Sequence, residues 1–317
     1  MVGTLLAFLS TIATARAAYT DTRFPTLIHW LEDRGAYLGP IELRRSGIGA
    51  GSGAFVTQDV DENEVLFTVP TSACVSLYDA CGDREVGETF ARLASKGQGG
   101  ATVALAGFIA KEWLCEGAEG KMWGPYLQML PWDAEWPPEE EQEQEHVLWW
   151  SEKQVDSLYG SEAYGDAVAI RDEVALACKV VKGLVGKSVR ASYRSRGDPI
   201  WKWIGSSADE DIDKATRGAF VSILTRAFGQ EDSEDEENRL VPLLDMLQHD
   251  SEPNVRHKTE VSESSGDERV VVRARRPLVA GEELLNFYGD LPPSKFLSRF
   301  GFVPGRSVGE FISSIQR

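Results

Sequence analysis

The residues of this chain that are best suited to bind a ligand closely are four glycines, Gly47, Gly49, Gly51 and Gly53. Gly49, Gly51 and Ala54 satisfy a degenerate GxGxxA pattern, which can bind dinucleotide phosphates. That site needs a preceding strand and a long helix opening at the glycines, because the helix N-terminus binds the pyrophosphate. The residues that follow, FVTQDVDENEVLFTVP, predict a hairpin instead. We therefore disfavour a dinucleotide site and expect an exposed backbone turn that a ligand can approach closely.

The other groups able to do chemistry are Arg226 in TRAFG, Asp245 and the pair Gln248-His249 in DMLQHD, and Tyr288 in NFYGD. An arginine can bind a carboxylate through two hydrogen bonds, and a tyrosine hydroxyl can orient an amine lone pair. Taken singly, an arginine near a helix end often compensates the helix dipole, and a lone histidine is more often structural. No HExxH, GxSxG or Walker pattern occurs, so metalloprotease, serine hydrolase and P-loop functions lack support.

The elements that must position these residues follow a strand, helix, strand order. Apolar residues at helical spacing in residues 24–38 predict a leading helix that ends near Gly35. Two β-rich runs with a polar link between them predict a hairpin over residues 54–69. Residues 102–229 are mainly helical, and strands return over residues 255–289. This order is typical of an interrupted α+β domain rather than of a Rossmann sheet.

The composition limits the kinds of partner that this chain is expected to bind. The chain has 317 residues, of which 42% are hydrophobic, so it can bury a sizeable core. Its 33 basic and 50 acidic residues give a net charge of -17, which disfavours a nucleic-acid surface and suits a basic peptide. The four cysteines form no CxxC pair, so neither a disulfide framework nor a zinc site is indicated.

The N-terminus has an apolar run over residues 2–15 that ends in Ala15-Arg16-Ala17. The run is too short for a bilayer-spanning helix, but it fits a targeting segment with a small-residue cleavage site. The alternative is the start of an ordinary buried helix. We expect the cytoplasm or nucleus, with a plastid location if residues 1–20 are a targeting segment.

Two segments carry a family resemblance, LVPLLDMLQHDSEPNV (240–255) and LVAGEELLNFYGDLPPSKFLSRFGFV (278–303). Together with GSG and TRAFG upstream, they resemble SET-domain protein-lysine methyltransferases of the Rubisco-methyltransferase-like branch. The resemblance implies an α+β fold of small β-sheets in which the first segment threads beneath the second in a knot-like crossing. It also implies three parts after residues 1–20: an N-terminal SET part (21–76), a mainly helical insertion (77–230) and a C-terminal catalytic part (231–317).

The activity that the resemblance implies is transfer of methyl groups from S-adenosylmethionine to a lysine amine of a protein substrate. In this resemblance Tyr288 is the catalytic residue at the lysine channel, and Phe228 binds the substrate lysine beside it. Phe228 corresponds to an aromatic residue of the lysine-modifying branch, where a histidine-modifying relative has a polar residue. The implied cofactor-binding residues are Gly51, Ser52, Gly53, Arg226, Asp245, Gln248, His249 and Phe302. Arg226 pairs with the cofactor carboxylate, the Gln248-His249 backbone hydrogen-bonds the adenine, and Phe302 belongs to an aromatic-Gly-Phe motif that closes over it.

The chain departs from the family pattern at Gln248, which stands where the family has asparagine. Plant-type relatives also continue into a helical substrate-binding domain, for which the residues after Val303 are too few. A protein-histidine methyltransferase and a non-catalytic SET-like interaction module therefore remain alternatives. We expect a monomer whose partner is a protein presenting a lysine, with no direct nucleic acid, no membrane and no metal.

Overall fold

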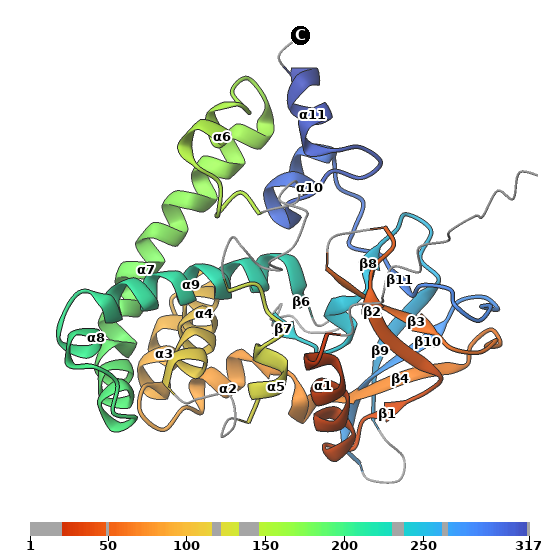
Figure 1. The fold of residues 1–317 in the computed structure, drawn as a ribbon, viewed down its shortest axis with the longest axis horizontal. Coiled ribbons are helices and arrows are strands. Elements are labelled where there is room, and N and C mark those ends of the chain that lie inside the picture. The colour runs from red at the N-terminus through yellow and green to blue at the C-terminus, as the bar shows by residue number, and fades with distance from the viewer. Residues whose placement is uncertain are drawn as a thin grey trace, which may run out of the picture.

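A computed structural model describes six stretches of the chain, residues 21–48, 51–115, 122–132, 146–229, 238–261 and 266–315. The predicted targeting segment, residues 1–20, lies outside them. Figure 1 shows the strands on one side of the molecule and most of the helices on the other. We call the helices α2 to α9, between residues 77 and 226, the helical part, and the strands with α1 the strand part. Among the described helices, none has both the length and the apolar character needed to cross a bilayer.

Helix α1 (Arg23–Asp33) opens the strand part. Its buried residues recur at helical spacing and form one apolar face, Phe24, Leu27, Trp30 and Leu31. The prediction of this helix is confirmed, and it ends at Asp33, next to its predicted end near Gly35. Gly35 adopts φ +83°, a left-handed backbone that suits glycine and stops the helix, so residues 37–38 are free to form a strand.

The largest sheet is antiparallel, with strand order β1-β4-β10-β9. Its strands are β1 (Tyr37–Leu38), β4 (Val65–Pro70), β10 (Glu268–Ala274) and β9 (Val255–Val261). Strand β10 is central, since its Val272 pairs with Phe67 on β4 and with His257 on β9. Segments from near the two ends of the chain therefore share one sheet.

The predicted hairpin over residues 54–69 is wrong, although both of its strands exist. Strand β3 (Ser52–Val56) pairs with β2 (Ile41–Arg45) and not with β4. The polar link between them turns at Asn63 (φ +67°), whose N–H donates to the Ala274 carbonyl at 2.9 Å. The link crosses between sheets because β10, distant in sequence, occupies the edge of β4 that a hairpin needs.

A small sheet joins the two parts. Its strands are β5 (Val75–Ser76), β7 (Arg239–Leu240) and β6 (Ala227–Phe228), in that order. Strand β5 precedes the helices in sequence and β6 follows them, and both pair with β7. The chain therefore leaves and re-enters the strand part at one place, as expected of an insertion. The exact boundaries of the predicted parts stay a prediction.

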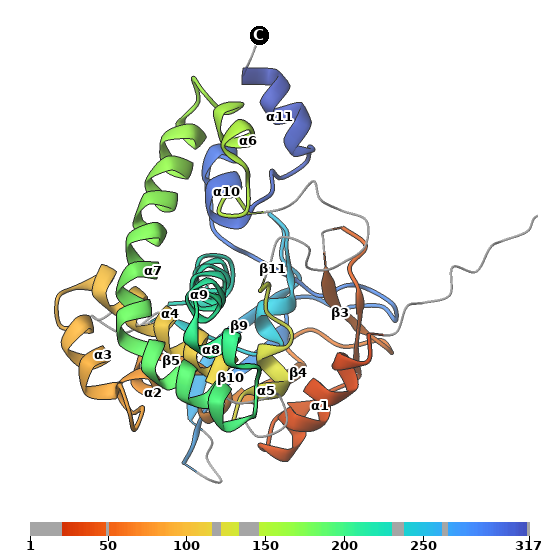
Figure 2. The ribbon, with the colours of Figure 1, turned by 60° about the vertical axis from the view of Figure 1, so that its left-hand side comes forward.

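The helical part packs around three long helices, α4, α7 and α9, which all contact one another. In Figure 2, α9 is seen nearly end-on while α7 runs from top to bottom of the view, so the two helices cross. Gly107 on α4 allows α3 and α7 to approach closely, because a Cβ there would lie 3.1 Å from the Phe90 ring on α3 and 3.3 Å from a Val181 methyl on α7. Helix α9 ends at Arg226, earlier than the helical stretch predicted to residue 229, because residues 227–228 join β7. The helices are α2 (Leu77–Cys81), α3 (Gly87–Ala94), α4 (Gln98–Cys115), α5 (Gly124–Leu127), α6 (Glu152–Asp156), α7 (Glu162–Ser195), α8 (Ile200–Ile204) and α9 (Ser207–Arg226).

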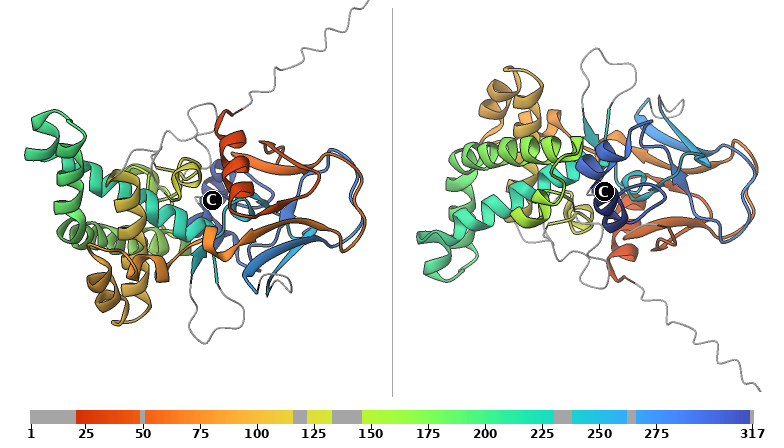
Figure 3. Two further views of the ribbon diagram at one scale, coloured as in Figure 1. Left: turned by 90° about the horizontal axis from the view of Figure 1, so that it is seen from below. Right: turned by 90° about the horizontal axis from the view of Figure 1, so that it is seen from above.

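The chain ends in α10 (Pro293–Phe300) and α11 (Val308–Ile315), which pack on α6 and the start of α7 in a second apolar cluster. The two views of Figure 3 show the helical and strand parts side by side along the molecule. Buried His146 links the segment before α6 to α10, because its Nε2 donates to the Arg299 carbonyl at 3.0 Å. Its Nδ1 accepts from the Leu148 N–H at 3.2 Å, so both ring nitrogens are used. The helical part is thereby tied to the C-terminal helices.

Candidate active site

The site forms where two distant segments cross. Strand β8 (Gln248–His249) runs parallel to β11 (Leu285–Asn286), with Leu285 opposite Gln248 and Asn286 opposite His249. The Asp250 N–H extends the pairing by donating to the Asn286 carbonyl at 2.9 Å. Because each strand has only two residues, the ladder supplies few hydrogen bonds, and side chains must hold the crossing.

Asn254 holds the crossing, a role that the sequence analysis missed. Asn254 is buried, with 1% of its surface exposed. Its side chain accepts from the Leu285 N–H at 2.7 Å and donates to the Glu283 carbonyl at 2.7 Å. The Asn254 N–H also donates to the Leu285 carbonyl at 3.1 Å. One asparagine therefore replaces several ladder hydrogen bonds. Its only sequence signal is its place directly before a strand, which does not reveal the partner.

Gln248 reaches the glycine turn. Its Nε2 donates to the Ser52 carbonyl at 2.8 Å, so the longer side chain found in place of asparagine ties the crossing to the turn. Gly51 adopts φ +89°, which favours glycine. At Gly53 a Cβ would collide with the Glu283 carboxylate, which also accepts from the Gly47 N–H at 3.1 Å. The turn thus needs glycine at position 51 because of its backbone conformation, and at position 53 because Glu283 leaves no room for a side chain.

Arg226 and Asp245 meet at the end of α9. The Arg226 Nη1 donates to the Asp245 backbone carbonyl at 3.1 Å and lies 3.6 Å from its carboxylate Oδ2. The Asp245 side chain is fully buried, whereas that of Arg226 is 26% exposed. Buried Tyr126, from α5, donates its hydroxyl to the same Oδ2 at 2.7 Å. Burial raises the pKa of Asp245, while the nearby Arg226 charge and the two hydrogen bonds oppose that shift.

Tyr288 follows β11 and faces the crossing. Its hydroxyl donates to the Leu247 carbonyl at 2.6 Å, and its N–H donates to the His249 Nδ1 at 3.2 Å. Burial raises the pKa of Tyr288 to about 12, although the Arg226 charge acts in the opposite direction. The hydroxyl therefore stays protonated at neutral pH, and its oxygen can still accept a hydrogen bond from a ligand.

Aromatic rings gather around His249 and Tyr288. The His249 ring lies 4.8 Å from Phe296 and 6.2 Å from Phe302, between ring centroids. The Tyr288 ring lies 5.0 Å from Phe300 and 6.4 Å from Phe302. Burial lowers the pKa of His249, so its ring favours the neutral form that accepts from Tyr288. These rings make an aromatic cluster next to the crossing, with ring planes tilted by 35° to 72° in these pairs.

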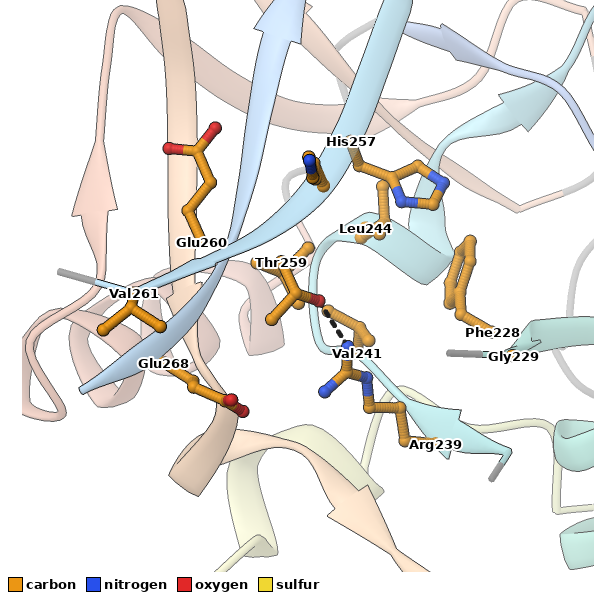
Figure 4. Close-up of a pocket in the computed structure, with 12 residues that line it drawn as sticks. Phe228, Gly229, Arg239, Val241, Leu244, His257, Thr259, Glu260, Val261 and Glu268 are labelled. Atoms are coloured by element: carbon orange, nitrogen blue, oxygen red, sulfur yellow. Dashed lines mark hydrogen bonds between the residues drawn. The ribbon is translucent and has the colours of Figure 1, made fainter. Parts of the chain in front are cut away.

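Phe228 lies in a different pocket of about 200 Å³, between β6, β7 and β9. Its ring packs against His257 at 5.2 Å between centroids, and Figure 4 shows the two rings adjacent. The described residues that line this pocket do not include Tyr288. Leu244 also lines this pocket, and it directly precedes Asp245 in the chain. The pocket and the contact between Arg226 and Asp245 are therefore neighbours along this turn.

The structure thus brings together all but one of the predicted site residues. Ser52 of the glycine turn contacts Gln248, Arg226 contacts Asp245, and His249 contacts Tyr288. Phe302 joins them through the aromatic rings, whereas Phe228 stands apart. Asn254 and Tyr126 are the additional residues, and both act through partners far away in sequence.

Comparison with known proteins adds a family match. The family model of the SET domain matches residues 51–289. The chain is 23% identical over 242 residues to the chloroplastic ribulose-1,5 bisphosphate carboxylase/oxygenase large subunit N-methyltransferase of Pisum sativum, covering 76% of this chain and 42% of that protein. It is 25% identical over 291 residues to N-lysine methyltransferase SETD6 of Rattus norvegicus, covering 87% and 53%. The chain therefore spans about half the length of the curated relatives that it matches.

Solved structures share the fold. The SET domain of LSMT bound to lysine and AdoHcy matches with a TM-score of 0.65 at 18% identity, covering 89% of this chain and 57% of that one. Rubisco LSMT bound to AdoMet matches with a TM-score of 0.63 at 18% identity, covering 90% and 57%. The predicted α+β fold with small sheets is confirmed.

Proposed function

Because the chain belongs to the SET-domain family, whose model matches residues 51–289, we propose that it is an S-adenosylmethionine-dependent protein-lysine N-methyltransferase. The predicted resemblance to this family is confirmed. The observation that carries the activity is the protonated Tyr288 hydroxyl, held on the Leu247 carbonyl beside the crossing. Relatives named as N-lysine methyltransferases support the choice of a lysine substrate.

The residues of the crossing fit the cofactor. Buried Asp245 Oδ1 and Asn286 Nδ2 have no hydrogen-bond partner within the described residues, as expected next to a polar ligand. The partly exposed Arg226 guanidinium would bind the cofactor carboxylate, and the turn at Gly51 offers its backbone. The Gln248-His249 backbone and the Phe302 ring would hold the adenine. When bound, S-adenosylmethionine supplies the methyl group on a positively charged sulfur.

The chain's own residues would prepare the amine. A free lysine has a pKa of about 10.4, so the site must favour its neutral form, which burial and a nearby positive charge both do. Tyr288 would then orient the amine by accepting one of its N–H bonds, without acting as a strong base. The Leu247 carbonyl fixes the direction of the Tyr288 hydroxyl. Positioning and desolvation, rather than proton abstraction by a side chain, carry this mechanism.

The preference for lysine over histidine rests on Phe228 as well as on the relatives. Phe228 supports lysine only through the family resemblance, since the pocket that it lines does not include Tyr288. The alternative, a protein-histidine methyltransferase, differs from the proposed function only in the residue that is modified. Mass spectrometry of labelled-methyl products from a cell extract tests it, because methylhistidine in place of methyllysine would overturn the lysine assignment.

Isothermal titration calorimetry with S-adenosylmethionine tests the cofactor first. We expect binding by the parent, and the absence of binding would favour the non-catalytic module. Arg226→Ala should weaken binding, whereas Arg217→Ala, an exposed arginine on the same helix, should not. Equal affinities for the parent and Arg226→Ala would contradict the carboxylate contact.

The extract assay tests Tyr288 separately. Tyr288→Phe should lower methyl transfer by about 100-fold or more because the amine loses its orientation, while cofactor affinity is kept. Tyr78→Phe is the matched control, since Tyr78 is 81% exposed on α2. Unchanged methyl transfer by Tyr288→Phe would reject the assigned role.

A further inference from the structure

The Tyr126 hydroxyl connects the helical part to the candidate site. Tyr126 is 0% exposed, and its hydroxyl donates to Asp245 Oδ2 at 2.7 Å across 119 residues of sequence. A buried hydroxyl without a partner is costly, so Tyr126 and Asp245 need each other. The contact joins α5 to the turn that precedes β8.

The same carboxylate faces Arg226. The Arg226 Nη1 lies 3.6 Å from Asp245 Oδ2 and donates to the Asp245 carbonyl at 3.1 Å. Asp245 is sealed from solvent, but the Arg226 side chain keeps 26% of its surface exposed. One edge of the guanidinium is therefore fixed by Asp245, and the remainder is accessible to a ligand.

We propose that Tyr126 is a positioning residue for the cofactor: it fixes the Asp245 carboxylate, which in turn orients Arg226 toward the cofactor carboxylate. This inference rests on the proposed function. Tyr126 itself touches neither cofactor nor substrate in this arrangement. Its contribution is to hold a buried negative charge in one place, so that the arginine need not be ordered when the cofactor binds.

The charge state of Asp245 gives this role a readout that packing alone would not move. Burial raises the pKa of Asp245, and the hydrogen bond from Tyr126 lowers it, so removing the hydroxyl should raise that pKa further. The other titratable groups that act on this pair are Arg226, Cys74 and Tyr288. Burial raises the pKa of Cys74 and that of Tyr288 to about 12 each, so both stay neutral. His249 also titrates in this site, with a pKa that burial lowers, so Asp245 is reported by a pH shift that Tyr126→Phe shows and the parent does not.

The helical part offers a matched control. Tyr193 is 2% exposed and donates its hydroxyl to Asp211 Oδ2 at 2.8 Å, between α7 and α9. Tyr193→Phe and Tyr126→Phe thus remove the same chemical contact at almost the same distance. Only the second contact lies beside Arg226, so a difference between the variants isolates that location.

The experiment is calorimetry with S-adenosylhomocysteine on the full chain, for the parent and both variants, between about pH 5.5 and about pH 9. For Tyr126→Phe we expect about tenfold weaker affinity near neutral pH, because a hydrogen bond to a charged group is lost. The pH below which affinity falls should rise by about one unit, because Asp245 then takes up its proton at higher pH. Tyr193→Phe should bind as the parent does over the whole range. Thermal melting of each protein checks that it is folded.

Each outcome of this experiment either supports or overturns the positioning role of Tyr126. Parent-like affinity and pH dependence in folded Tyr126→Phe would overturn the positioning role, as would an equal loss of affinity in both variants. If Tyr126→Phe does not fold, Asp245→Asn takes its place: its amide cannot ionise, so we expect weaker binding without the acidic fall. A parent-like acidic fall in Asp245→Asn would overturn the proposal. A parent that binds no S-adenosylhomocysteine at any pH would instead defeat the proposed function, and the positioning role with it.

Discussion

The helical part and the crossing of β8 with β11 are held together in different ways. Helices α4, α7 and α9 pack through apolar side chains, with ion pairs such as Lys182–Asp213 between α7 and α9. The crossing has two-residue strands and depends on single polar side chains, above all Asn254. Apolar packing is spread over many contacts, whereas each of these hydrogen bonds has one geometry. Loss of a packing residue should therefore reduce stability, whereas loss of a crossing residue should also change the site.

The largest expected loss of stability comes from the helical part. Phe90→Ala removes a 0% exposed ring that packs on Gly107, and should lower the free energy of unfolding by about 4 kcal/mol. Urea denaturation measures this loss. The affinity of the remaining folded protein for S-adenosylmethionine should be unchanged. Phe90→Leu, which keeps most of the volume, should cost less than half as much, and a loss of cofactor affinity at full folding would break the contrast.

The crossing should respond differently to Asn254→Ala. The change leaves the partly buried Leu285 N–H and Glu283 carbonyl without this partner, and should cost about 3 kcal/mol. Cofactor affinity should fall together with stability, because β11 leads into Tyr288. The control is Ser222→Ala in the helical part, whose buried hydroxyl bonds the Gly218 carbonyl within one helix. If Asn254→Ala lost stability but bound cofactor as the parent does, the crossing would not depend on this side chain.

The link between the helical part and α10 should depend on pH. Burial lowers the pKa of His146 to about 4, below the usual value near 6.5. The unfolded chain therefore takes up this proton first, and the stability that neutral His146 contributes above pH 6.5 is lost as the pH falls toward 4. The advantage of the parent over His146→Gln should shrink by about 3 kcal/mol across that window, measured by urea denaturation. His29→Gln, at an exposed position on α1, is the matched control. A constant gap for His146→Gln would show that His146 takes up its proton at the same pH in the folded and unfolded chain, so that burial does not lower its pKa.

The smallest effect is expected at Gln248. Gln248→Met keeps the length of the side chain but removes the donor to the Ser52 carbonyl, and should cost about 1 kcal/mol of stability. The glycine turn loses a tie to the crossing, so calorimetry should show weaker cofactor binding. Gln248→Asn, with the family's residue, is the informative comparison because its amide is one methylene shorter. Parent-like binding by both variants would show that the tie to Ser52 is dispensable.

Local patterns in the sequence predicted the leading helix, the helical stretch and the returning strands, because periodicity depends on neighbouring residues. They failed on the hairpin over residues 54–69, since nothing local reveals that β10 takes the edge of β4. Through the family resemblance, the motifs singled out Arg226, Asp245, His249 and Tyr288 as site residues. The contacts of Arg226 with Asp245 and of His249 with Tyr288 come from the structure alone. Phe228 lies apart from Tyr288 in its own pocket, and its role as a substrate contact stays a prediction.

By itself, the sequence determined the interrupted α+β order and the identity of the groups that can do chemistry. Only the tertiary structure decided how those groups are held. Tyr126 and Asn254 look like ordinary residues of a loop and a turn, and their importance comes from partners that the chain brings to them on folding. The physical reason is that a buried polar side chain must find its partner in space, whereas a sequence pattern records only what lies nearby along the chain.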